Sequence, residues 1–172
     1  MSVHEEFEEQ THHAHEPFDK RVAASMALIA ALLAIVSVLG HILTTEELLH
    51  QQKASDEWAY SQAKDIRHYM AQVASDVLQG APGKVGLVSK YGQDDKRYKS
   101  DTATIQEKAS EYEQESYRDG RKAFRMHIGE VFLEIAIVLS SLAILAKRKF
   151  MWFVAIASAA VGSLTAATSL FI

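Results

Sequence analysis

The sequence predicts an all-α integral membrane protein with three transmembrane helices and an extramembrane helical hairpin between the first and the second. Three observations indicate this class. Although 23% of the 172 residues are charged, three long stretches contain almost no charge. Each stretch is close to the roughly 20 apolar residues that cross a hydrocarbon layer. The segment between the first two instead places apolar residues at alternating steps of four and three, the spacing of a coiled coil.

The three transmembrane helices are predicted at residues 22–45, 129–147 and 150–172. Only the basic turn Lys147-Arg148-Lys149 separates the last two, so these must run antiparallel. Phe150 and Trp152 beside this turn are typical of a membrane–water interface. A buried helix of a soluble domain would account for any one of these stretches, but not for three in so short a chain.

Residues 46–128 are predicted to form the extramembrane hairpin, with a first helix that continues from the membrane and a loop near 80–100. Glycines and Pro82 indicate the loop, and Asp101 is a suitable N-cap for the second helix. Each helix carries a seam of mostly apolar residues. These are Ala59, Ala63, Ile66, Met70, Val73 and Val77 on the first, and Ile105, Ala109, Tyr112, Ser116, Ala123 and Met126 on the second.

The N-terminal tail, residues 1–21, is acidic and rich in histidine, and it lacks the basic start of a signal peptide. Its histidines lie among glutamates and could bind Zn²⁺, Ni²⁺ or Cu²⁺ weakly. The tail has no regular metal-site spacing, so a solvated acidic segment is the favoured interpretation and no cofactor is predicted. The possible metal ligands are His4, His12, His13 and His15.

Glu134 is the most informative single residue, because a carboxylate inside a transmembrane helix is costly and indicates a function. It follows Glu130 by about one helical turn, so both point to the same side. His41, at the matching end of the first span, is the expected partner, and His127 lies at a similar depth. These four residues predict either an ion or proton site, or polar contacts that hold helices together; the second is favoured.

Small residues recur every four positions along the third span, at Ala155, Ala159, Ser163 and Ala167. Such a row lets helices approach closely in lipid. It fits packing within one chain and packing between subunits equally well.

Enzymatic and nucleic-acid-binding functions find no support in the sequence. The chain has no cysteine, and no phosphate-binding loop, Ser/His/Asp arrangement or HExxH motif is present. The formal net charge of −4 does not favour nucleic acid.

Lysines and arginines near the membrane set the expected orientation. Five of them share the side that holds residue 20 and the turn at 147–149, and as many lie on the other side. The short turn is the better indicator, because charge bias is reliably read only over short loops. The N-terminus and the turn are therefore expected in the cytoplasm, and the hairpin outside.

Two stretches, DEWAYSQAKDIR (56–67) and GEVFLEIAIVLSSLAILAKRK (129–149), resemble the bacterial membrane-protein family known as domain of unknown function 4337. The order of features also agrees: an apolar span followed by Gly40-His41, a charged helical middle and a pair of spans. The resemblance implies a prokaryotic, multi-pass protein of the inner membrane and no particular activity.

The expected function is a non-enzymatic scaffold that self-associates in the bilayer into a homo-oligomer, or serves as a subunit of a larger complex. The alternative is an oligomeric channel, or a protein that conducts ions or protons, with Glu134 and His41 at the pore. Weak metal binding by the tail ranks third.

Overall fold

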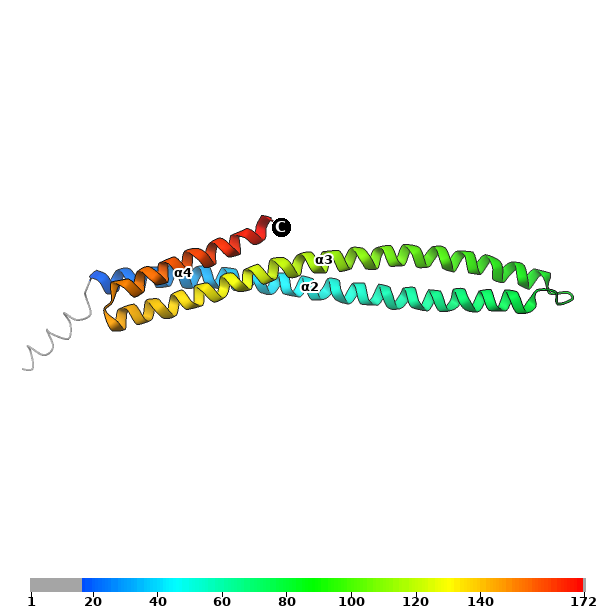
Figure 1. Cartoon of the computed structure of the whole chain (residues 1–172), viewed down its shortest axis with the longest axis horizontal. Coiled ribbons are helices and arrows are strands. Elements are labelled where there is room, and N and C mark those ends of the chain that lie inside the picture. The colour runs from blue at the N-terminus through cyan, green and yellow to red at the C-terminus, as the bar shows by residue number, and fades with distance from the viewer. Residues whose placement is uncertain (1–16, 172) are drawn as a thin grey trace, which may run out of the picture. The chain divides into compact units, whose positions relative to one another are not determined.

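Residues 17–171, the part that the computed structural model describes, are helical apart from the turns at 79–84 and 147–148. Helix α2 spans Pro17–Leu78, α3 spans Val85–Ala146 and α4 spans Lys149–Thr168, followed by the short 3₁₀ helix η1, Ser169–Phe171 (Figure 1). Three of these helices contain a stretch long and apolar enough to cross a membrane. The all-α class is therefore confirmed, and so is the presence of three helices that are long and apolar enough to cross a membrane.

The two long helices, of 62 residues each, are uninterrupted because the prolines lie where a helix tolerates them. Pro17 is the first residue of α2, a position whose N–H has no partner in the helix, and Pro82 lies in the turn after it. In the same turn Gly80 (φ 87°) and Gly83 (φ 74°) adopt the left-handed conformation that favours glycine. The turn is closed by a hydrogen bond from the Ala81 N–H to the Leu78 carbonyl, 3.1 Å.

The predicted loop near 80–100 is wrong, because α3 already begins at Val85. Asp101, the predicted N-cap, lies well inside this helix and faces Lys64 instead. Gly86 and Gly92 suggested a loop, yet a glycine inside a helix costs only about 1 kcal/mol. This stretch of α3 also contacts α2, where Asp95 lies 2.7 Å from His68.

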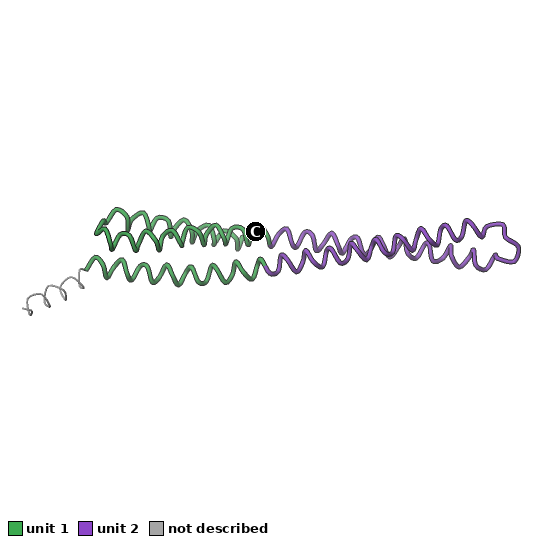
Figure 2. Tube along the Cα trace, turned by 90° about the horizontal axis from the view of Figure 1, so that it is seen from below, with its two compact units in different colours: residues 1–44, 120–172 green, residues 45–119 purple. Residues whose placement is uncertain are grey.

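The chain divides into two compact units, which are described separately (Figure 2). Unit 1 comprises residues 1–44 and 120–172, and unit 2 comprises residues 45–119.

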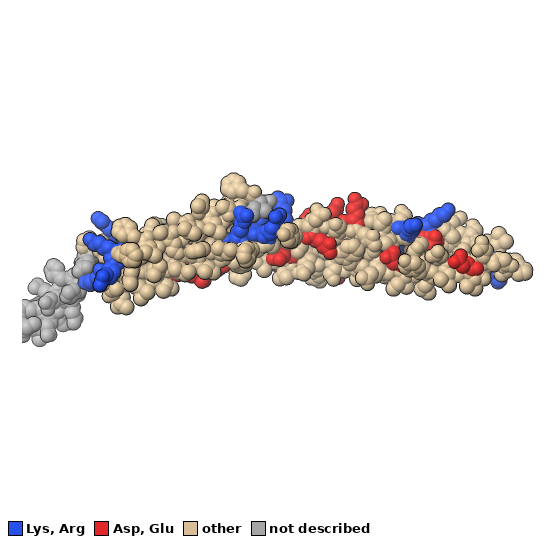
Figure 3. Space-filling view, viewed as in Figure 1, with Lys and Arg blue, Asp and Glu red and all other residues tan. Residues whose placement is uncertain are grey.

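Unit 1 has an apolar core to which α2, α3 and α4 all contribute. Its buried members are Ile29, Val36, Met126, Leu133, Ala136, Ala159 and Ala166. At the end that holds the basic turn, the Trp152 indole N–H donates to the Ser25 hydroxyl at 3.0 Å, and the Phe18 ring meets Trp152 edge-on. On the part of unit 1 shown in Figure 3, Lys and Arg gather near both of its ends, and the surface between these ends is almost free of charge.

Helices α3 and α4 approach each other until their backbones touch. A Cβ atom on Gly162 would lie 2.7 Å from the Gly129 carbonyl oxygen, and one on Gly129 would lie 2.7 Å from that of Gly162. Nearby, the Ser158 hydroxyl donates to the Phe132 carbonyl at 2.8 Å. Glycine at both positions therefore sets the separation of the two helices.

The buried face of α4 departs from the predicted row of small residues after Ala159. Ala155 and Ala159 are buried as expected, but the next buried residues are Gly162 and Ala166. Ser163 is half-buried and Ala167 is exposed. At about 100° per residue, steps of four drift by some 40° each, so a face in continuous contact must alternate steps of four and three.

In unit 2 the two helical segments are joined by polar side chains. The Trp58 indole N–H donates to Glu113 at 2.8 Å, and the Lys64 ammonium donates to Asp101 at 2.8 Å. The seam predicted on the second segment is buried or half-buried, with Ala109, Ala123 and Met126 the most enclosed.

The seam predicted on the first segment does not face the second segment. Its six residues, Ala59, Ala63, Ile66, Met70, Val73 and Val77, are all exposed. The buried residues of this segment are Ala54, Ser61 and Ala71 instead. Both sets repeat at coiled-coil spacing, and choosing the more apolar set predicted the wrong face. Ion pairs and small residues make the contact with the second segment that hydrophobic residues were expected to make.

Candidate functional site

A cluster of polar side chains lies in unit 1 where the first predicted span ends and the second begins. His127 is at its centre. Its Nε2 atom lies 3.1 Å from the Thr44 hydroxyl, and its Nδ1 atom lies 3.1 Å from a Glu130 carboxylate oxygen. Gly40 makes room for the ring, because a Cβ there would lie 3.3 Å from its Cε1 atom.

The hydrogen bonds of this cluster accommodate His127 in either protonation state. The single proton of the Thr44 hydroxyl can go to the Gly40 carbonyl, 3.0 Å away, or to Nε2 of His127. When the hydroxyl proton of Thr44 points to the Gly40 carbonyl, the Nε2 atom of His127 carries its own proton and donates it to the Thr44 oxygen. When it goes to Nε2, the ring is neutral and Nδ1–H donates to Glu130. The Thr44 hydroxyl, the His127 imidazole and the Glu130 carboxylate therefore form one continuous chain of hydrogen bonds.

His41 and Ser37 complete the cluster from α2. The His41 ring meets the His127 ring edge-on, with 6.4 Å between centroids. The Ser37 hydroxyl is within hydrogen-bonding reach of Glu130. Of the four residues predicted for this site, His41, His127 and Glu130 come together.

Glu134 does not join them. Its side chain is exposed on α3, although it follows Glu130 by one turn. Within residues 17–171 no hydrogen bond or ion pair links Glu134 to another residue. Its exposed neighbours on the helix are the apolar Val131, Ile135 and Val138. The carboxylate that lies in the cluster with His41 is therefore Glu130 and not Glu134.

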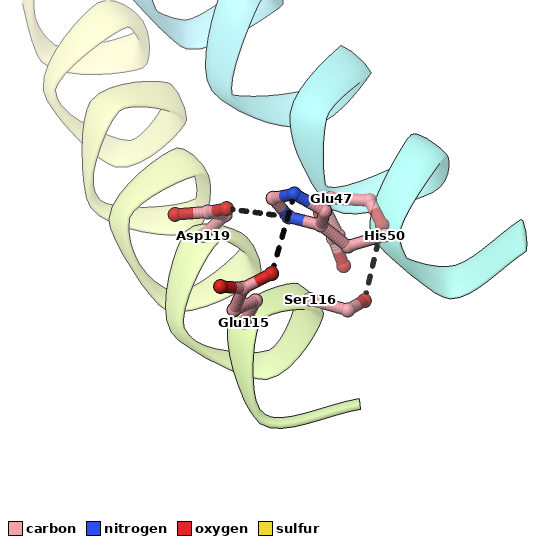
Figure 4. A network of polar contacts seen from close by, with 5 residues as sticks. All are labelled: Glu47, His50, Glu115, Ser116 and Asp119. Atoms are coloured by element: carbon pink, nitrogen blue, oxygen red, sulfur yellow. Dashed lines mark hydrogen bonds and ion pairs between the residues drawn. The ribbon is translucent and has the colours of Figure 1, made fainter. Parts of the chain in front are cut away.

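A second polar network lies in unit 2 around His50 (Figure 4). The imidazole points from α2 toward α3, with Nδ1 3.1 Å from Asp119 and Nε2 3.5 Å from Glu115. The Ser116 hydroxyl donates to the Glu47 carbonyl at 3.1 Å. The imidazole ring stacks on the Tyr112 ring, with 6.2 Å between the two ring centroids.

Sequence reasoning missed this network, although one signal pointed to it. Asp119 occupies the position between Ser116 and Ala123 that completes the seam of the second segment. Its side chain is buried, with 9% exposed. A carboxylate on a buried seam needs a partner, and His50 supplies it.

Two further contacts of unit 2 are electrostatic. Asp101 accepts a hydrogen bond from Lys64 and raises the pKa of that ammonium above its usual value. His68 pairs with Asp95 at 2.7 Å. Three pairs, His50 with Asp119, Lys64 with Asp101 and His68 with Asp95, thus place a cationic or titratable group of α2 against a carboxylate of α3.

Metal binding receives no geometric support from residues 17–171, among which no three His, Asp or Glu side chains could hold an ion together. The tail histidines His4, His12, His13 and His15 lie outside the described residues.

Residues 18–172 match the family described as Domain of unknown function (DUF4337). No curated protein and no solved structure matches the chain.

Proposed function

The chain belongs to the family described as Domain of unknown function (DUF4337), and we propose that it is a non-enzymatic membrane scaffold that self-associates in the bilayer. The observation that carries this proposal is the exposed carboxyl of Glu134 on a helix apolar enough to span a membrane. Intramembrane carboxyls seldom face lipid and usually pair inside a bundle. A neighbouring subunit is the natural source of a partner for Glu134.

The surroundings of Glu134 support this assignment. Val131, Ile135 and Val138 give the same side of α3 an apolar surface that fits lipid or another helix. Polar contacts between helices in lipid contribute on the order of 1 kcal/mol. One such contact in each subunit adds specificity to an association that packing drives.

Substitution of Glu134 tests the proposal. We expect Glu134→Leu to weaken the oligomer by about 1 kcal/mol, because the polar contact is lost. Glu134→Gln should leave it nearly unchanged, since an amide retains a donor and an acceptor. Leu164→Val, at an exposed apolar position of α4, is the control and should have no effect. Subunit mass by native mass spectrometry in detergent is the measurement, and a monomeric wild-type chain would refute the proposal.

An ion- or proton-conducting oligomer is the second candidate. It is favoured by the hydrogen-bonded cluster of Thr44, His127 and Glu130, which accommodates His127 both neutral and charged. A pH-dependent flux in reconstituted vesicles that disappears in Glu134→Gln, while the oligomer keeps its mass, would favour conduction. Gln forms hydrogen bonds but carries no charge.

The scaffold would lie in the inner membrane of a bacterial cell, with unit 2 outside the bilayer as a coiled-coil hairpin. The N-terminus and the turn at 147–149 would be cytoplasmic, because the Lys and Arg residues of this short turn are retained on that side.

Cysteine labelling tests the orientation. The chain has no native cysteine, so a single introduced thiol gives an unambiguous signal. We expect Ser89→Cys, at an exposed position near the start of α3, to react with a membrane-impermeant reagent in intact cells. Phe150→Cys, exposed beside the basic turn, should react only after lysis. The opposite pattern would invert the topology.

A further inference from the structure

The unexplained surface of unit 2 is the row formed by Ala59, Ala63, Ile66, Met70, Val73 and Val77, here called the outer stripe. Its four large side chains are 60–75% exposed. The residues of α2 that face α3, such as Ser61, His68 and Ala71, lie nearly opposite the stripe at about 100° per residue. Contacts among residues 17–171 leave the stripe uncovered.

The outer stripe has the form of a helix-pairing surface. It keeps coiled-coil spacing over its whole length, and a helix seam with that spacing fits a second helix. Near its far end is a shallow hollow of about 510 Å³, lined by Tyr69, Met70, Val73, Ala74, Val77, Leu78 and Tyr91. The hollow offers an apolar recess to a side chain of a partner.

We propose that the outer stripe pairs with the outer stripe of a second copy of this chain, in parallel and in register. This inference rests on the proposed self-association in a membrane. Copies with one topology expose unit 2 on the same side of the bilayer and with the same polarity. Identical residues of two neighbouring stripes then lie at the same height, so Ile66 meets Ile66 and Val73 meets Val73.

The charges beside the stripe are compatible with this arrangement. In a parallel pair, the residue just before every second seam residue, here Ala63 and Met70, faces the residue five positions later in the partner. Gln62 then faces Arg67, and Tyr69 faces Ala74, so no like charges meet. Asp56 lies three residues before Ala59, at the next position along the seam, and would face Asp56 of the second copy. Repulsion between these two carboxylates limits the pairing to residues 59–77.

The size of the stripe explains why the membrane is needed. Six side chains are far fewer than the roughly 20–30 residues on each side of a stable interface. Anchoring of both copies in one bilayer makes the second contact effectively intramolecular. The stripe thus sets the register of an association that the spans support.

Disulfide cross-linking of the full-length protein in membranes tests the inference. Under mild oxidation we expect Ile66→Cys and Val73→Cys each to form several-fold more covalent dimer than Gln72→Cys. Gln72 is the matched control, because it is exposed beside Val73 but lies off the stripe. In the Ile66→Cys background, Val73→Glu should reduce the dimer several-fold, whereas Gln72→Glu should not.

Three outcomes would overturn the inference. Equal cross-linking at positions 66, 72 and 73 would show random collision, and cross-linking of Val73→Cys to a different protein would show another occupant. A native oligomer without cross-links at 66 and 73 would refute the stripe pairing and leave the proposed scaffold standing. A monomeric mass would instead refute the scaffold, and the pairing with it.

Discussion

Gly162→Ala is expected to destabilise unit 1 by about 1–3 kcal/mol, the usual cost of an extra methyl group in a packed core. The new Cβ would lie 2.7 Å from the Gly129 carbonyl oxygen and 2.9 Å from the Phe132 Cβ. A backbone atom cannot move aside as the end of a flexible side chain can, so α3 and α4 must separate. The measurement is the free energy of unfolding in detergent.

Gly92→Ala is the matched control, because a Cβ at Gly92 meets no atom within 4 Å. There the same change should stabilise the helix by up to about 1 kcal/mol, since alanine favours helix over glycine. Equal effects of the two substitutions would show that the close approach of Gly129 and Gly162 does not determine the stability.

Ala63→Pro is expected to break α2 and to cost about 3 kcal/mol or more, because Ala63 lies in the interior of this helix. Proline removes one backbone hydrogen bond and its ring collides with the preceding turn. Spin labels on cysteines at the exposed positions 52 and 76 should lie about 36 Å apart along an intact helix with a rise of about 1.5 Å per residue. In Ala63→Pro the distance should shorten and broaden.

Ala63→Gly separates a broken helix from a weakened one. It should cost only about 1 kcal/mol and keep the narrow distance distribution. A narrow, unchanged distance in Ala63→Pro would contradict an uninterrupted helix at this position.

The second seam shows how far sequence periodicity reaches. Ile105, Ala109 and Met126 were predicted to be buried and are buried, because each has apolar character at the spacing that one helix face requires. The prediction of a loop at 80–100 was wrong for a local reason. Glycine weakens a helix without ending it, and contacts between the two segments determine whether the helix forms.

The candidate site illustrates the same limit. Glu134 was expected to partner His41, but the carboxylate that lies with His127 and His41 is Glu130. One turn of a helix separates Glu130 from Glu134, and helical spacing puts both on one side. Only the packed position of α2 determines which of the two is enclosed.

The sequence by itself determined the helical class, the three apolar spans and the turn at Lys147–Lys149, because these depend on composition and on where helix-breaking residues occur. The tertiary structure decided which face of each helix is buried. α2 carries two rows at coiled-coil spacing, an apolar one through Met70 and a polar one through Ser61 and His68. Within the chain, carboxylates on α3 select the polar row, since a buried charge such as Asp119 must be paired while an exposed apolar side chain is tolerated.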